Sequence, residues 1–106
     1  MPGAVRLSDS CTGHGCWPSR VNDTASGDVF ANSRGAHRTG DHWVTHCCTA
    51  PPFPCHDSSQ VTGSPNVFVN GRAWARIGDA VACGSSNATD SGNVIVNGEI
   101  EYIWKV

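Results

Sequence analysis

The feature that most constrains the fold of this chain is an internal repeat, which is clearest in residues 66–79. A run of strand-forming residues at 67–69 is followed by Asn70-Gly71, and a second run leads through Trp74 to a Gly-Asp pair. Asn-Gly between two such runs is a strong hairpin signal, because a type I′ turn needs positive φ at both central residues. The pattern therefore predicts a β-hairpin.

The same pattern occurs near residues 28–41 and 93–104. The first copy keeps the closing Gly-Asp but has Ser33 and Gly35 in place of the Asn-Gly turn. The third has Asn97-Gly98 but lacks the closing pair and ends in an alternating tail. One hairpin cannot bury its own apolar face, whereas three repeats can close around a shared axis. We therefore predict an all-β fold, a small cone of three pseudo-threefold hairpins, with residues 1–106 as one domain.

The segments before the hairpins each carry one metal-ligating residue type. His56 and Cys83 both lie eleven residues before the first valine of their hairpins. His14 lies fifteen residues before the corresponding valine, as if residues 16–19 were a short insertion. If the hairpins surround a threefold axis, these three side chains converge on it, and the repeat predicts a metal site near the vertex.

Composition narrows the classes of function. The net charge is −2 with neutral histidines, so no basic patch is available for nucleic acid. No apolar run approaches the roughly 20 residues of a membrane span, and residues 1–10 have no signal-peptide core. We expect synthesis in the cytoplasm. Helical periodicity is nearly absent. Residues 41–56 are expected to form an irregular connector because they are rich in proline. Residues 4–9 are expected to form a degenerate half-hairpin.

Six cysteines and five histidines favour metal binding in a small fold with a limited core. A disulfide framework needs an oxidising compartment. Cys11–Cys16 or Cys47–Cys55 pairing after export is the alternative use of these thiols. Nitrogen and sulfur ligands favour zinc, with iron as the alternative metal.

Several motifs together resemble the PAAR-repeat proteins, which tip the spikes of contractile injection systems. The motifs are Leu7-Ser8-Asp9, the Thr-Gly-His-Gly at 12–15, the hairpin ends at 37–41 and 75–79, and residues 82–85. The resemblance implies a sharpened cone with a metal near its vertex, held by three His and one Cys. It also implies a homotrimeric β-helical spike as partner, VgrG in type VI secretion or the central spike of a phage tail, with one monomer per spike.

The resemblance implies His14, His56 and Cys83 as ligands, in agreement with the repeat. It places the fourth ligand in the connector, where we favour His46, because His46 follows Asp41 by five residues much as Cys83 follows Asp79 by four. His42 is the alternative fourth ligand, or Cys47 if the connector runs differently. His37 aligns with Ala75 and is expected to be a strand residue.

The predicted function is structural: a zinc-stabilised, membrane-piercing tip that caps the spike, contacts a target envelope transiently, and is not an enzyme. A small zinc hydrolase is disfavoured, because four protein ligands leave no open position for water and the chain lacks H-E-x-x-H. An effector-docking adaptor of the same machine is the other alternative, although the short tail leaves little room for an effector. Phage virion and bacterial secretion system are both compatible with these patterns.

Overall fold

The computed structural model describes residues 2–96, and all regular structure within this range is β. The strands are β1 (Phe30–Ala31), β2 (Arg34–Gly35), β3 (His42–Cys47), β4 (Cys55–Ser59), β5 (Phe68–Val69) and β6 (Arg72–Ala73). They form three two-stranded antiparallel sheets, β1-β2, β3-β4 and β5-β6. Residues 2–96 contain no helix that could cross a membrane. The predicted all-β class is confirmed.

Two of the predicted hairpins are β1-β2 and β5-β6. In the second, Asn70 and Gly71 have φ of 54° and 79°, as a type I′ turn requires. In the first, Asn32 and Ser33 adopt φ of 54° and 67°, so the same turn forms without glycine. The third predicted hairpin is described only as far as Val96, and its remaining residues, including the alternating tail, lie outside the described part.

An Arg-Asp turn occurs three times, in Arg6–Asp9, Arg38–Asp41 and Arg76–Asp79. In each, the carboxylate accepts a hydrogen bond from the backbone N–H of the arginine three residues earlier, at 2.7 to 2.8 Å, and others from its guanidinium. In each unit the turn directly follows the second strand of a hairpin, as the closing Gly-Asp of the repeat predicted. In the third unit the strand at residues 94–96 pairs with residues 2–4: Ala4 N–H donates to the Val94 carbonyl, and Val96 N–H donates to the Pro2 carbonyl. The turn at residues 6–9 therefore closes the third hairpin.

The pseudo-threefold axis passes through a ring of backbone hydrogen bonds. Val5 N–H donates to the Ala75 carbonyl, Ala75 N–H to His37, and His37 N–H to Val5, at 2.9 to 3.1 Å. All three residues are fully buried. His37 is thus a core residue equivalent to Ala75, as its alignment predicted, and it lies outside the candidate metal cluster.

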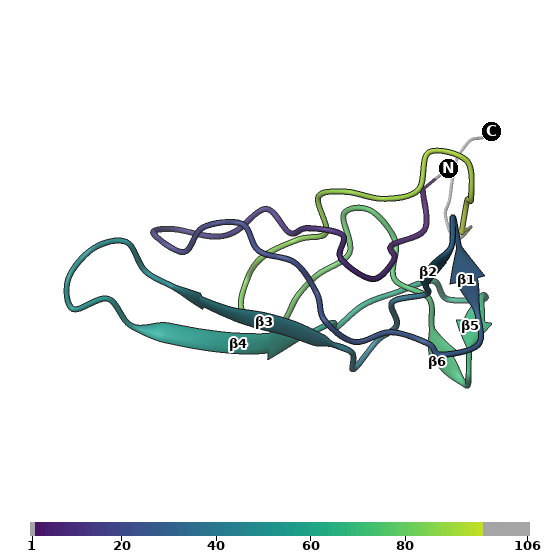
Figure 1. The fold of residues 1–106 in the computed structure, drawn as a ribbon, viewed down its shortest axis with the longest axis horizontal. Coiled ribbons are helices and arrows are strands. Elements are labelled where there is room, and N and C mark those ends of the chain that lie inside the picture. Colours follow the sequence, from purple (N-terminus) through teal and green to yellow (C-terminus); the bar gives the residue numbers. More distant parts are fainter. Residues whose placement is uncertain (1, 97–106) are drawn as a thin grey trace.

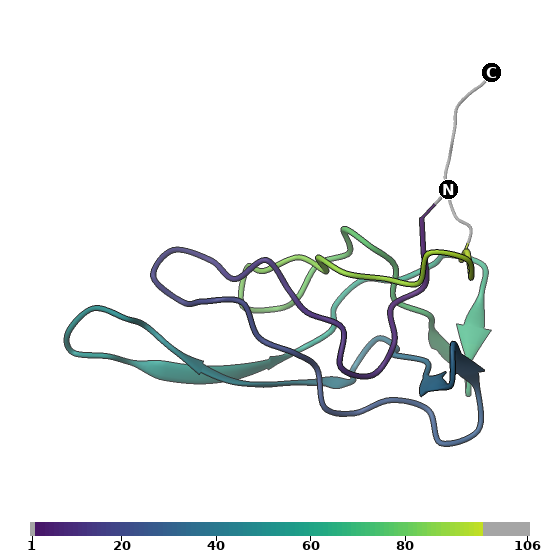
Figure 2. The same cartoon turned by 45° about the horizontal axis from the view of Figure 1, so that its top comes forward.

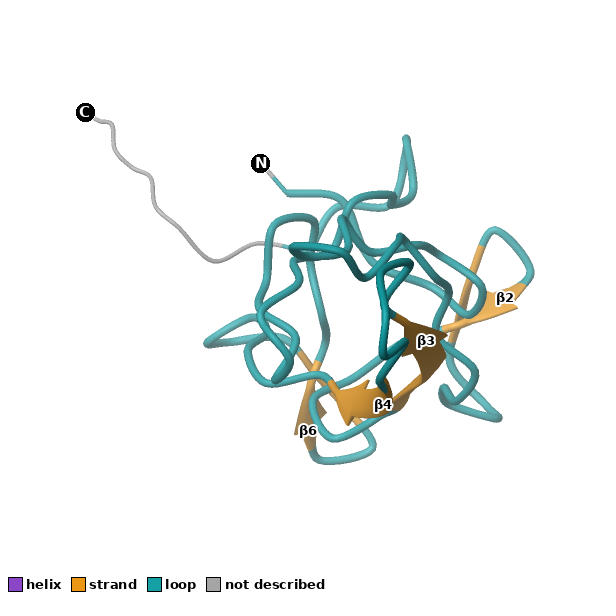
Figure 3. Ribbon diagram, turned by 90° about the vertical axis from the view of Figure 1, so that its left-hand side faces the viewer, coloured by secondary structure: helices purple, strands orange, loops and turns teal. Residues whose placement is uncertain are grey.

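The segment at residues 41–56 is not the irregular connector that was predicted. Residues 42–59 form the longest hairpin, β3-β4, whose register shifts between Trp43 and His46. This hairpin projects to one end of the molecule, the vertex, far from the short hairpins β1-β2 and β5-β6 at the other end, the base (Figures 1 and 2). Seen from the vertex, the chain surrounds a central axis, and β2 and β6 lie at its periphery (Figure 3). Trp43, Cys11 and Val81 pack together beneath the vertex.

Candidate metal centre

Three segments rise from the Arg-Asp turns toward the vertex, one in each repeat. The first, residues 10–21, carries His14, and the third, residues 80–86, carries Cys83. The second is the β3-β4 hairpin, which carries His46 and His56 as paired residues on neighbouring strands. The pseudo-threefold arrangement therefore brings together side chains from positions far apart in the sequence.

The four predicted ligands form one cluster. One ligand atom from each of His14, His46, His56 and Cys83 lies within 4.8 Å of all the others. The His56 Nε2 is 3.1 Å from the His14 Nε2 and 2.7 Å from the His46 Nε2. A tetrahedral zinc with Zn–N distances near 2.05 Å separates its nitrogens by about 3.3 Å. A small outward movement of the rings would therefore accommodate such an ion.

The donor set fits a metal chemically as well as in space. His46 Nδ1 lies 2.8 Å from the Pro18 carbonyl, an acceptor, so this nitrogen carries the proton and Nε2 presents its lone pair to the cluster. Burial lowers the pKa of His46 and of His14 below the ordinary value, and His56 and Arg20 lower the pKa of His14 further. Both imidazoles are thus kept neutral, which is the form that binds metal.

The neighbours of Cys83 favour its thiolate form by lowering the pKa of the thiol. Burial acts to raise its pKa, but hydrogen bonds from Ser85 and Arg20 outweigh this effect and leave the pKa below its ordinary value. The buried Arg20 guanidinium lies 3.4 Å from the Cys83 sulfur and 3.1 Å from the Cys11 sulfur, and it donates to the Val44 carbonyl. Arg20 therefore supports the sulfur ligand from beneath, a role that no sequence signal indicated.

Trp17 covers the histidines and was also missed. Its indole stacks on His14 with ring centroids 5.0 Å apart and on His56 at 4.9 Å. Its Nε1–H donates to the Pro54 carbonyl, which ties the first segment to the β3-β4 hairpin. The short insertion at residues 16–19, visible in the repeat alignment, was the available signal for this extra side chain.

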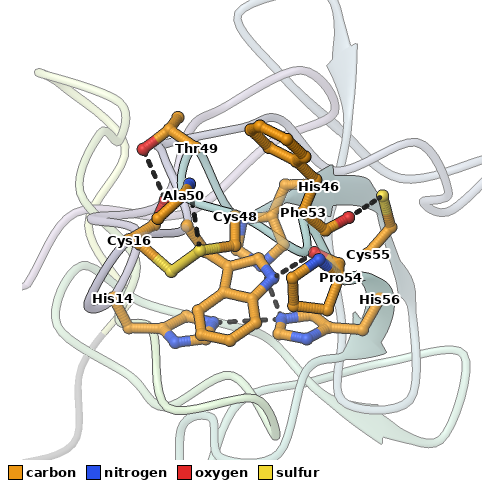
Figure 4. Close-up of a disulfide and its surroundings, with 11 residues drawn as sticks. His14, Cys16, His46, Cys48, Thr49, Ala50, Phe53, Pro54, Cys55 and His56 are labelled. Carbon is orange, nitrogen blue, oxygen red and sulfur yellow. Dashed lines mark hydrogen bonds between the residues drawn. A yellow bond between two sulfur atoms is a disulfide. The ribbon is translucent and has the colours of Figure 1, made fainter.

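Two disulfides connect the segments that carry the histidines, and Figure 4 shows one of them, Cys16–Cys48. Cys16–Cys48 joins the first segment to the end of β3, and Cys47–Cys55 joins β3 to β4. The second was one of the two alternatives from sequence, whereas Cys11 does not pair with Cys16 and is a free, buried core residue. Cys47 is therefore not available as the alternative fourth ligand.

His42 lies outside the cluster. Its Nδ1 is 2.6 Å from Asp23 and its Nε2 is 2.9 Å from Asp57, so both ring nitrogens are engaged on an exposed face of β3. The carboxylates of Asp57 and Asp23 raise the pKa of His42 above its ordinary value, opposite to the change at His14 and His46. This environment favours an imidazolium and not a metal ligand.

We expect the pH dependence of stability to report the His42 interaction. Because its pKa is raised on folding, the contribution is complete below the unfolded value of about 6.5 and is lost as pH rises through the folded pKa. Chemical denaturation of wild type and His42→Gln should differ by a small amount near about pH 6 and converge near about pH 9. A difference that grew with pH would contradict this assignment.

The comparisons with known proteins agree with the geometry. The family profile described as PAAR motif matches residues 9–89, so the chain belongs to the PAAR motif family. The matched range includes the β1-β2 and β5-β6 hairpins and all four residues of the cluster, and it ends before the third predicted hairpin.

Two curated relatives come from Pseudomonas aeruginosa strains. The chain is 33% identical over 82 residues to the NAD(P)(+) glycohydrolase toxin Tse6, and equally to the (p)ppApp synthetase toxin Tas1. Each alignment covers 72% of this chain but only 18% of the relative. The chain thus spans about a fifth of the length of these toxins.

Proposed function

We propose that this protein caps the trimeric spike of a contractile injection machine and that a bound metal, preferably zinc, stabilises its pointed end. One observation carries the proposal: Phe30, Phe68 and Ile95 are 57%, 60% and 44% exposed at the same position of the three repeats. Their neighbours Ala31, Val69 and Val96 are buried. The base therefore presents three equivalent apolar side chains that residues 2–96 leave exposed, as a docking face requires.

The symmetry of this face supports a threefold partner. A homotrimer presents three identical patches around its axis, and a single chain can match all of them only if its own surface repeats three times. The three hairpins supply such a repeat at the base. One chain per spike trimer is the stoichiometry that follows.

The metal would act structurally. His14, His46, His56 and Cys83 would fill a tetrahedral coordination sphere and tie the three vertex segments together, so binding would contribute directly to folding free energy. A catalytic zinc keeps an open position for water. The complete set of four protein ligands therefore disfavours the zinc hydrolase alternative.

The capping proposal is tested by capture of a spike trimer. We expect native mass spectrometry of the chain mixed with the VgrG-type spike of the same machine to give one chain per trimer. Phe68→Ser should weaken binding by roughly tenfold or more, because a Phe side chain would be returned to water. Thr45→Ala, an exposed change near the vertex, is the control. Unchanged affinity for Phe68→Ser, or no complex with wild type, would refute capping by this face.

A second role is carriage of a toxin on the spike. Both relatives are named as toxins, and the part of each that resembles this chain is only 18% of its length. This relationship favours type VI secretion over a phage tail as the setting. Their enzymatic activities are not carried over, because the alignment covers the PAAR region alone. Delivery of a reporter domain fused after residue 106 into target cells would test carriage.

A further inference from the structure

The outermost part of the β3-β4 hairpin is the tip loop, residues 49–54, with the sequence Thr-Ala-Pro-Pro-Phe-Pro. All six residues are exposed, and Phe53 is 57% exposed. The ring of Phe53 points away from His14 and His56 (Figure 4). The aromatic side chain thus contributes nothing to the candidate metal centre and faces solvent at the far end of the molecule.

The two chain segments next to this loop carry no charged side chain. Residues 13–19 and 43–56 contain no Asp, Glu, Lys or Arg, although charged residues make up 15% of the chain. Exposed loops usually carry such residues, since charge keeps them solvated. An exposed loop without charged side chains would enter an apolar medium without the cost of desolvating them.

The tip loop also leaves no backbone N–H without an acceptor. Thr49 N–H donates to the Cys16 carbonyl, Ala50 N–H to the Cys48 sulfur, and Phe53 N–H to the Ala50 carbonyl. The other three residues are prolines, which have no N–H to satisfy. In a bilayer, an unsatisfied backbone donor is costly because no water is present to replace the missing partner.

The loop is held in this form from both sides. Cys48 and Cys55, which flank it, are bonded to Cys16 and Cys47 respectively. The Cys48 N–H donates to the Pro54 carbonyl across the base of the loop. The hydrogen bonds of the tip loop should therefore persist when the surrounding water is removed.

We propose that the tip loop inserts into the interface of a lipid bilayer, with Phe53 at the boundary between headgroups and acyl chains. A protein partner would need directional polar contacts around an apolar centre, and the loop offers no charged group or free N–H for them. Without cations the loop should bind zwitterionic lipid, and binding should not depend on salt. The biological role of this lipid insertion rests on the proposed capping function, but lipid binding can be measured without the spike.

The test is flotation of the full chain with phosphatidylcholine vesicles in low and high salt. We expect wild type to float with the vesicles at both salt concentrations. Phe53→Asn should lower the partition coefficient about tenfold, because the apolar ring is lost. Asn tolerates the positive φ of 58° at this position, so the loop should keep its shape. Phe68→Asn removes an equally exposed ring at the base and should float like wild type.

The outcomes separate the two proposals. Failure of wild type to float, equal flotation of Phe53→Asn, or selective loss with Phe68→Asn would overturn lipid insertion by the tip loop. Ala50→Asp keeps the Phe53 ring but adds a negative charge to the loop, so it should also abolish flotation. This variant tests lipid insertion independently if Phe53→Asn alters the metal content. Spike capture is measured in parallel: Phe53→Asn should bind the spike like wild type, so loss of capping and loss of lipid binding are told apart.

Discussion

Protein purified without added metal is expected to contain about one zinc per chain, and His56→Ala should reduce this to near zero. His56 is the most informative ligand to remove, because its Nε2 lies within 3.1 Å of the corresponding nitrogens of both His14 and His46. Three remaining donors would bind zinc far more weakly. Zinc binding in small structural sites contributes of order 10 kcal/mol at neutral pH, so we expect a loss of several kcal/mol in the free energy of unfolding.

The matched control is His42→Ala. His42 lies on the same hairpin, but its ring nitrogens bond to Asp23 and Asp57 and not to the cluster. Elemental analysis should find wild-type metal content in this variant, and chelation should lower the melting temperature of wild type and His42→Ala alike. Full metal content in His56→Ala, or its loss in His42→Ala, would show that the ligand set is wrong.

Asp41→Ala is expected to be strongly destabilising, although Asp41 lies outside the candidate metal centre. The buried Asp41 carboxylate accepts hydrogen bonds from Arg38, Thr24 and Arg72, which joins two hairpins through one turn. Removing it leaves the Arg38 guanidinium partly buried without its partner. Breaking a buried pair in this way costs about 3 to 5 kcal/mol, and the exposure of Arg72 places the expected value near about 3 kcal/mol.

The pH dependence of stability provides a second test of the role of Asp41. Burial acts to raise the pKa of Asp41, but hydrogen bonds from Arg38 and Thr24 outweigh it and leave the pKa below 3.8. The contribution to stability is therefore present above the unfolded value and is lost as pH falls through the folded one. Urea denaturation from neutral to acidic pH should show a shallower acid limb for Asp41→Ala than for wild type. Asp23→Ala, an exposed carboxylate, should unfold almost like wild type, and a comparable loss there would refute the special role of Asp41.

Much of the fold was predictable because its signals are local. Asn70-Gly71 specifies a turn through the φ angles that these residues tolerate, and the same spacing of turn and strand residues identified two hairpins. The positions of His14, His56 and Cys83 within the repeat predicted that they converge, and the structure brings them together with His46. Their role as ligands stays a prediction for elemental analysis.

The tertiary structure decided what depends on contacts between distant segments. The sequence indicated a half-hairpin at residues 4–9 but not that its partner strand is residues 94–96, because the two strands lie far apart in the sequence. Nor did it indicate that residues 42–59 form the longest hairpin, since prolines at the tip resemble a connector until the flanking strands pair. The Cys16–Cys48 disulfide and the Arg20 contact with Cys83 likewise join residues far apart in sequence. Turn and strand preferences act within a few residues, whereas these contacts exist only after the three repeats close around their axis.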